Sequence, residues 1–92
     1  AGEESLVAVL RDPRSGRRLT VRSTQPGVQV YTGNWLAGSP LSKSGRSYED
    51  YDGVAIECQG FPDAPNRPDF PSAVLRPGKN YRQTIRFRFD AE

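Results

Sequence analysis

The chain has 92 residues, a length that fits one domain or part of a larger one. Its 13 basic and 11 acidic residues leave a net charge of +2, which is too small and too mixed to indicate a nucleic-acid-binding surface. It contains one cysteine and no histidine, so this chain alone cannot build a disulfide framework, an ordinary zinc site or a nucleophile–histidine pair. No apolar run is long enough to span a membrane as a helix.

The first third of the chain predicts a β-hairpin. Residues 6–10 are all apolar, which predicts a strand covered on both faces. Residues 18–23 alternate between apolar and polar types, as in a strand with one face in a core. Between them, residues 12–16 contain proline and glycine in the order that favours a tight turn.

A third strand is predicted at residues 28–32, after the turn at Pro26 and Gly27. Residues 33–52 are rich in glycine, serine and charged side chains and predict a long loop, and loops of this length are usually functional or mobile. We expect Trp35 and Leu36 to anchor its start.

Residues 54–59 predict another strand, and the alternation places Glu57 and Gln59 on one face. The opposite face, which we expect to point into the core, carries Val54, Ile56 and Cys58. Residues 61–71 follow with four prolines, which exclude a regular helix or a central strand and predict a stiff loop.

Residues 82–89 alternate and predict the last strand, with Ile85, Phe87 and Phe89 pointing inward. Its other face would carry Arg82, Arg86 and Arg88, either as an anion site or as a solvated edge that discourages edge-to-edge pairing. The sequence has no helical period, so the predicted class is all-β: a segment of an antiparallel β-sandwich without substantial helix.

Glu57 is the first candidate catalytic residue. A carboxylate beside a stiff loop that walls a partly dry pocket is suited to act as a general base. The alternative is a solvated carboxylate on the outer face of a strand, which is the commoner situation.

Gln29 is the second candidate, because it shares a face with Tyr31 and could meet Glu57 if the two strands are neighbours. An amide, a carboxylate and an aromatic ring together suit a sugar, which offers hydroxyls and apolar C–H faces. The alternative is the polar outer face of a sandwich. No metal site is expected, because the spacing of Asp63, Asn66 and Asp69 matches no calcium loop.

Long motifs connect these features along almost the whole chain. They occupy residues 23–36 (STQPGVQVYTGNWL), 56–66 (IECQGFPDAPN), 70–71 (FP), 75–81 (LRPGKNY) and 84–89 (TIRFRF). In this order, and together with the first hairpin, they resemble the C-terminal part of the aldose 1-epimerases, also called galactose mutarotases.

The resemblance implies a fold and an activity. It implies one unit over residues 1–92, the C-terminal portion of a larger β-sandwich of the galactose mutarotase-like type whose upstream part is absent here. It also implies interconversion of the α and β anomers of hexoses such as galactose and glucose by acid/base ring opening, without a cofactor. Carried over by position, Glu57 would be the base and Gln29 a sugar ligand. The family's general-acid histidine has no counterpart in this chain.

Further expectations concern activity, partners, compartment and an alternative function. The chain alone should be inactive, and its partners should be a hexose and either the missing upstream chain or a second copy, with no nucleic acid and no membrane. The polar start, Ala1 to Ser5, is unlike a signal peptide, which favours the cytoplasm unless a signal has been removed. The alternative function is a non-catalytic sugar-binding or structural β-domain derived from the same family.

Overall fold

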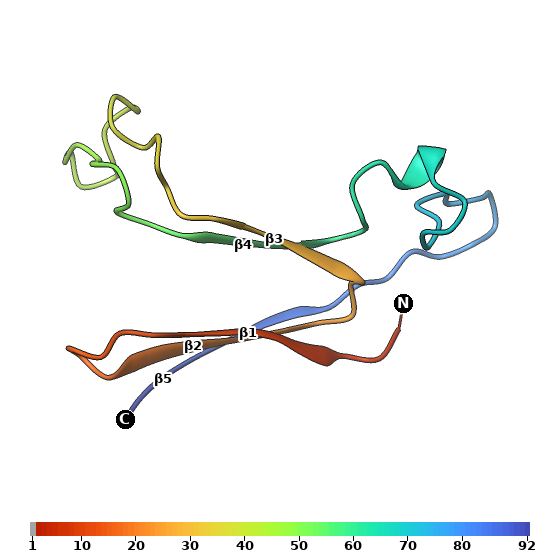
Figure 1. The fold of residues 1–92 in the computed structure, drawn as a ribbon, viewed down its shortest axis with the longest axis horizontal. Coiled ribbons are helices and arrows are strands. Elements are labelled where there is room, and N and C mark those ends of the chain that lie inside the picture. Colours follow the sequence, from red (N-terminus) through yellow and green to blue (C-terminus); the bar gives the residue numbers. More distant parts are fainter. Residues whose placement is uncertain (1) are drawn as a thin grey trace.

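The computed structural model describes residues 2–92, and it is built from two antiparallel β-sheets (Figure 1). A three-stranded sheet has the order β1-β2-β5, and a two-stranded sheet is formed by β3 and β4. The elements are β1 (Ser5–Arg11), β2 (Arg17–Ser23), β3 (Gly27–Tyr31), β4 (Ala55–Gln59), a 3₁₀ turn η1 (Ala64–Asn66) and β5 (Ile85–Ala91). The all-β prediction is confirmed. No helix within residues 2–92 is long and apolar enough to cross a membrane.

The predicted hairpin of β1 and β2 is confirmed, and its turn is fixed by local hydrogen bonds. The carboxylate of Asp12 accepts from the Arg14 amide at 3.2 Å and from the Ser15 hydroxyl at 2.8 Å. Gly16 has a φ of 73°, a left-handed conformation that glycine adopts without steric cost.

The prediction that β1 is covered on both faces is wrong. β1 is an edge strand, and its pairing with β2 shifts between Leu6 and Ala8 at a β-bulge. The extra residue places Leu6 opposite Arg22 and Ala8 opposite Val21, so the two side chains lie on different faces of the sheet. Leu6 and Val9 are exposed, and they share their face with charged residues.

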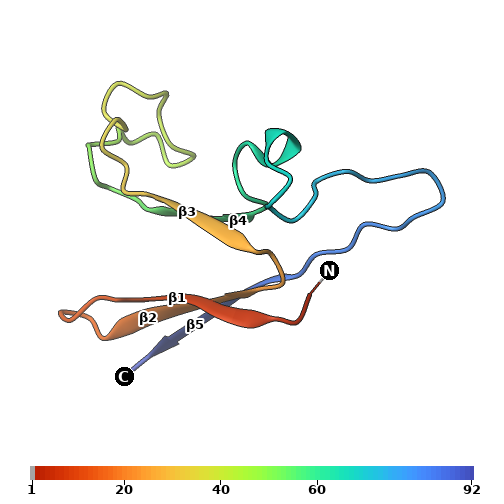
Figure 2. The same ribbon diagram turned by 45° about the vertical axis from the view of Figure 1, so that its right-hand side comes forward.

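β5 pairs with β2 along its whole length, although the two strands are far apart in the sequence (Figure 2). It begins three residues later than predicted, so Arg82 does not lie on the strand face with Arg86 and Arg88, and that prediction is wrong. The reason is local: just before the strand one backbone bond remains, from the Thr24 amide to the Thr84 carbonyl at 3.1 Å, and side chains make the neighbouring bonds. The Thr24 hydroxyl accepts from the Thr84 amide at 3.0 Å, and the Gln25 amide group donates to the Gln83 side chain.

An ion pair fastens the end of β5 to β2. The guanidinium of Arg18 donates two hydrogen bonds to the carboxylate of Asp90, both at 2.8 Å. These bonds hold the pKa of Asp90 below its ordinary value of 3.8, against a smaller opposing effect of desolvation. Because the folded-state pKa is lowered, the pair stabilises the fold above the unfolded-state pKa, and this stabilisation is lost as pH falls through the folded-state pKa.

We therefore expect Asp90→Asn to lower the free energy of unfolding at neutral pH, and to have little effect once the pH is well below 3.8. Urea unfolding at the two pH values measures this difference. Asp69→Asn is the matched control, because its ion pair with Arg67 is exposed and local in sequence. An equal loss at both pH values would show that the charge of Asp90 is not what matters.

The described chain has almost no closed core. Val21 and Ala64 are its only buried large or small apolar side chains, and Ser23 is buried as well. Its accessible surface is 7642 Å², against about 5,300 Å² expected for a compact monomer of its mass. Its radius of gyration is 16.7 Å, against about 12 Å expected for its length. The two sheets diverge as an open wedge (Figure 1), and many large apolar side chains are exposed.

The prediction that Trp35 and Leu36 anchor the loop between β3 and β4 is confirmed for Leu36 and wrong for Trp35. Trp35 is 81% exposed and anchors nothing through its ring, whereas Leu36 is half-buried. The anchor is the buried Gly33, whose carbonyl accepts from the amides of Leu36 at 3.3 Å and Tyr51 at 2.7 Å. The loop closes on these backbone groups, and the Leu36 side chain packs beside Gly33 and Gly53.

Candidate functional site

Gln29 and Glu57 lie directly opposite each other on β3 and β4. The strands are antiparallel, and the register is continuous from the pair of Gly27 with Gln59 to the pair of Tyr31 with Ala55. Residues opposite each other in such a ladder share a face, with Cβ atoms about 4.5–5.5 Å apart. The structure thus brings together the two candidates that the sequence places on separate strands.

This face of the two-stranded sheet is open to solvent. Both Gln29 and Glu57 are exposed, whereas Ile56 and Cys58, on the other face, are half-buried. Cys58 lies opposite Val28 in the ladder, so this apolar pair occupies the face opposite to that of Gln29 and Glu57.

The two faces alternate as expected, but the prediction that the face of Val54, Ile56 and Cys58 lies in a core is wrong for this chain. Val54 precedes the strand and is 47% exposed, and Val30 on the same face is 59% exposed, because nothing within residues 2–92 covers that face.

Cys58 offers a test of this register. We expect its thiol to react several-fold more slowly with an alkylating reagent in the native chain than in urea, because it is half-buried on the apolar face. The matched comparison is Glu57→Cys in a Cys58→Ser background, whose thiol should react faster than that of Cys58. Equal native rates for the two thiols would contradict the assignment of faces.

Tyr31 shares a face with Gln29 by alternation, as predicted, and it is paired with the small Ala55. Its hydroxyl accepts a hydrogen bond from the backbone amide of Trp35 at 3.1 Å, which fixes the end of the side chain toward the loop. The site therefore consists of a carboxylate, an amide and an aromatic ring along adjacent strands.

The loop after β4 is braced internally. The rings of Phe61 and Phe70 pack with their centroids 5.2 Å apart and their planes tilted by 56°, and the guanidinium of Arg67 lies 4.7 Å from the centre of the Phe70 ring. Phe61 also packs against the start of β3, where a Cβ on Gly27 would come within 2.8 Å of its ring. The stiffness expected from the prolines is thus reinforced by aromatic contacts.

The carboxylates of this loop already accept hydrogen bonds from neighbouring side chains. The Asn66 side chain donates to the carboxylate of Asp63 at 2.6 Å, and Arg67 contacts Asp69 at 3.3 Å. Among residues 2–92, no three potential metal ligands gather into a cluster.

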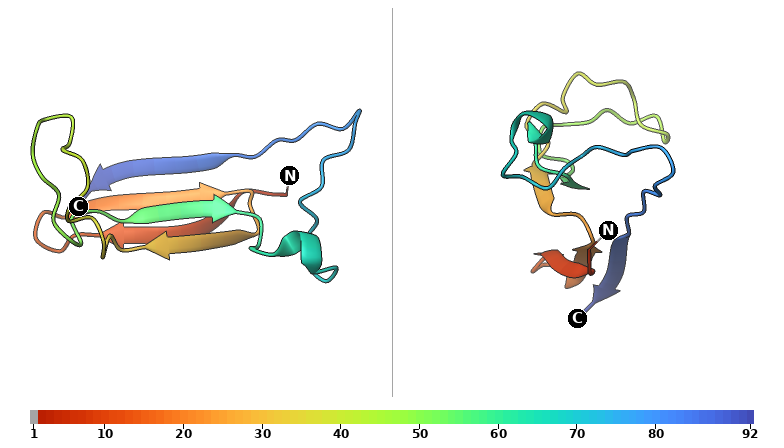
Figure 3. Two further views of the ribbon diagram at one scale, coloured as in Figure 1. Left: turned by 90° about the horizontal axis from the view of Figure 1, so that it is seen from above. Right: turned by 90° about the vertical axis from the view of Figure 1, so that its right-hand side faces the viewer.

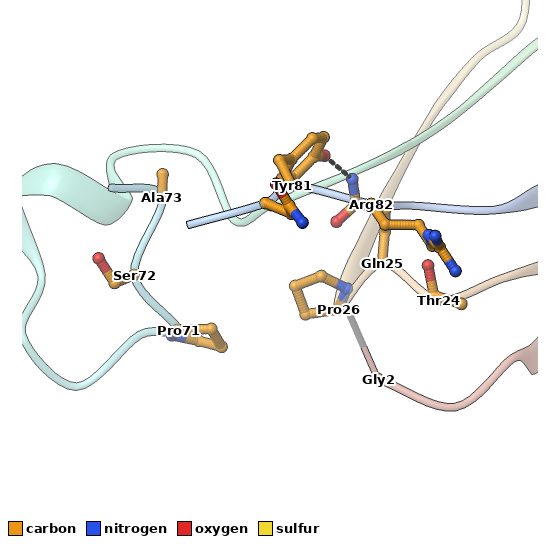
Figure 4. A pocket seen from close by; sticks show the side chains of 11 residues that line it. Gly2, Thr24, Gln25, Pro26, Pro71, Ser72, Ala73, Tyr81 and Arg82 are labelled. Atoms are coloured by element: carbon orange, nitrogen blue, oxygen red, sulfur yellow. Dashed lines mark hydrogen bonds between the residues drawn. The ribbon is translucent and has the colours of Figure 1, made fainter. Parts of the chain in front are cut away.

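A separate hollow of about 570 Å³ lies where the chain enters β3 and approaches β5 (Figure 4). The Gln25 side chain donates to the Tyr81 hydroxyl there at 2.7 Å, beside Arg82 and Pro26. Sequence reasoning did not single out Gln25 or Tyr81, because neither position departs from a strand or loop pattern. The hollow is not lined by Gln29 or Glu57.

The chemistry available on the open face is limited and specific. A carboxylate can accept a proton, and an adjacent amide can donate to or accept from a hydroxyl. The chain has no histidine, so a general acid of that type would come from outside it. The open face thus offers a proton acceptor beside a hydrogen-bonding amide.

Comparison with known proteins places this chain in a family. The sequence model described as Aldose 1-epimerase matches residues 2–88. Galactose mutarotase from Mus musculus is 47% identical over 87 residues, which are 95% of this chain and 25% of that protein. The Homo sapiens galactose mutarotase is 46% identical with the same coverage, and the Escherichia coli aldose 1-epimerase is 40% identical over 82% of this chain and 22% of its own length. The chain spans about a quarter of these relatives, and it belongs to the aldose 1-epimerase family.

Proposed function

We propose that this chain supplies the base-bearing part of an aldose 1-epimerase, which interconverts the α and β anomers of hexoses such as galactose and glucose. The observation that carries the proposal is the direct cross-strand pairing of Glu57 with Gln29 on an exposed face, in a chain of this family. The chain would form the C-terminal portion of a larger sandwich, and the uncovered apolar surface supports that arrangement.

The proposed reaction begins with transfer of the proton on the anomeric hydroxyl to the Glu57 carboxylate. As the C1 carbonyl forms, the bond between C1 and the ring oxygen breaks, and an acid protonates that oxygen. Rotation about the C1–C2 bond and reclosure on the other face of the carbonyl give the second anomer. Gln29, beside the base, would hydrogen-bond a sugar hydroxyl and hold C1 near Glu57. The resemblance implies a histidine as the acid, and this chain contains no histidine, so that residue would lie outside it.

The test is a chimaera in which this chain replaces the segment of the mouse galactose mutarotase that it matches. Polarimetry of freshly dissolved α-galactose, corrected for the spontaneous rate, measures turnover. We expect the chimaera to accelerate anomerisation. A folded chimaera that binds galactose without accelerating anomerisation would favour the alternative, a non-catalytic sugar-binding domain. A folded chimaera that does neither would favour a structural role.

Gln29→Ala in the same chimaera should raise KM by about tenfold and change kcat much less. The amide would contact the sugar equally in the ground and transition states, so its loss costs roughly one hydrogen bond of binding. Steady-state polarimetry over a range of galactose concentrations separates the two constants. Gln83→Ala is the control, because Gln83 bonds Gln25 before β5 rather than facing Glu57. A fall in kcat with KM unchanged would contradict a binding role for Gln29.

A further inference from the structure

Arginines gather on one face of the three-stranded sheet, where β5 lies beside β2 (Figure 3). Arg22 of β2 lies directly opposite Arg86 of β5, and Thr20 of β2 lies directly opposite Arg88 of β5. Opposite residues share a face, with Cβ atoms about 4.5–5.5 Å apart, and residues two positions apart along a strand are separated by roughly 7 Å. These four residues, here called the arginine square, bring three guanidinium groups and one hydroxyl together.

A hollow of about 280 Å³ lies over the arginine square. All four side chains of the square line it, together with Arg18 and Asp90. Its volume is many times the roughly 30 Å³ that one molecule occupies in liquid water. The hollow can therefore hold a polyatomic ion in contact with the guanidinium groups.

Arg88 reaches its ion-pair partner only at long range. It lies 4.0 Å from Asp90, and both oxygens of that carboxylate accept hydrogen bonds from Arg18 at 2.8 Å. The side chain of Arg88 is 77% exposed. Its guanidinium group can therefore donate to an added anion without giving up a hydrogen bond within the sheet.

Arg22 and Arg86 share one carboxylate, that of Glu4. Glu4 accepts two hydrogen bonds from Arg86, at 3.0 and 3.2 Å, and it lies 3.4 Å from Arg22. Like charges directly opposite each other in a sheet repel, so this carboxylate offsets the repulsion between the two arginines. A single carboxylate for two guanidinium groups leaves this pair with an excess of positive charge.

Protection of the strand edge does not account for the arginine square. Charges that discourage edge-to-edge pairing lie on the edge strand itself. Arg86 and Arg88 meet that description, but Arg22 lies on β2, the central strand of the order β1-β2-β5. Of the two alternatives that the sequence leaves open for this face, an anion site or a solvated edge, the anion site accounts for all three arginines.

The arginine square also lies on the face that the rest of the sandwich would not cover. The opposite face of the same sheet carries the cross-strand pairs of Val21 with Phe87 and of Leu19 with Phe89. In a β-sandwich, each sheet turns one face to the core and the other outward. The apolar face is suited to the core, so the square would remain on the outer surface of the complete protein.

We propose that the arginine square binds a phosphate group, either inorganic phosphate or the end group of a phosphomonoester. Guanidinium groups stay charged and donate paired, parallel hydrogen bonds that match the spacing of phosphate oxygens. The Thr20 hydroxyl would be a further donor beside them. The phosphate would add the negative charge that Glu4 and Asp90 do not supply to all three arginines. This inference depends on the square, and not on the proposed catalytic function.

Isothermal titration calorimetry tests the proposal in the chimaera, where the remainder of the sandwich is in place. At low ionic strength we expect inorganic phosphate to bind saturably, and about tenfold or more tightly than nitrate, which carries a single charge. Glycerol 3-phosphate identifies the source of the phosphate group. Tighter binding than that of inorganic phosphate would make a phosphomonoester the ligand, and equal or weaker binding would make it free phosphate.

Substitutions of opposite effect test the assignment of residues. Arg88→Gln should weaken phosphate binding by about tenfold, because it removes a hydrogen bond between charged groups. Glu4→Gln should tighten binding several-fold, because it removes the carboxylate that competes with phosphate for Arg22 and Arg86. Arg14→Gln, in the exposed turn of the first hairpin, is the matched control and should leave the affinity unchanged.

Four outcomes would overturn the proposal. They are no binding of phosphate, binding that nitrate matches, equal losses of affinity in Arg88→Gln and Arg14→Gln, and weaker binding in Glu4→Gln. Circular dichroism spectra that match the parent chimaera establish that each variant is folded. Calorimetry measures no turnover, so a chimaera that fails to accelerate anomerisation would not change the result for phosphate.

Discussion

Replacing Glu57 by glutamine in the chimaera should lower kcat by about 10²–10⁴-fold, which corresponds to roughly 3–5 kcal/mol of activation free energy. Glutamine keeps the size of the side chain and can still hydrogen-bond a sugar hydroxyl, but it cannot take the proton from the anomeric hydroxyl. Because the ground-state contact survives, KM should change much less than kcat. Polarimetry over a range of galactose concentrations measures both constants.

Glu49→Gln is the matched control for this substitution. Glu49 is also an exposed glutamate, but it lies in the loop between β3 and β4 rather than beside Gln29. It should keep kcat within about twofold of the parent chimaera, since surface changes away from reacting groups have small effects. If Glu57→Gln kept more than about a tenth of the parent kcat, Glu57 would not be the base, because loss of a general base costs more than that.

Gly33→Ala should be the most destabilising small substitution in the long loop. Gly33 has a φ of 77°, and a Cβ there would lie 2.6 Å from the Gly53 carbonyl oxygen and 2.9 Å from the Leu36 side chain. The left-handed conformation alone costs about 1–2 kcal/mol for a residue with a Cβ, and the backbone clash adds to it. We expect a loss of more than about 2 kcal/mol in urea unfolding of the chain.

Gly45→Ala separates these two contributions. Gly45 has a φ of 80° in the same loop, but a Cβ there would meet nothing within 4 Å. It should therefore show only the conformational cost, about 1 kcal/mol. If Gly33→Ala and Gly45→Ala were equally destabilising, the contacts between Gly33, Gly53 and Leu36 would not be what anchors the loop.

The strands, and the face on which each of the two candidate residues lies, were predictable because they depend on local alternation. The two-residue alternation of side chains along a strand predicted that Glu57 and Cys58 point to opposite faces. It also predicted that Gln29 and Tyr31 share a face, and the structure agrees with both. What alternation cannot supply is the register between strands. The pairing of Gln29 with Glu57 became visible only in the structure, since 27 residues separate the two positions in the chain.

The wrong predictions have separate physical origins. Trp35 and both faces of β1 were expected to be buried because they are apolar. Burial also requires other parts of the chain to pack over these side chains. A β-bulge at Val7, which no pattern in the sequence marks, then turned Leu6 to the charged face. The start of β5 moved because side chains of Thr24 and Gln25 bond the residues before it.

Rescue of Glu57→Ala by a small carboxylic acid tests the central claim most directly. In the chimaera this substitution removes the carboxylate and leaves space for formate beside the anomeric hydroxyl. If Glu57 is the base, the anomerisation rate, corrected for enzyme-free catalysis by formate, should rise with formate concentration in Glu57→Ala and stay flat in the parent and in Gln29→Ala. A dependence on formate no steeper in Glu57→Ala than in the parent would contradict the assignment of Glu57 as the base.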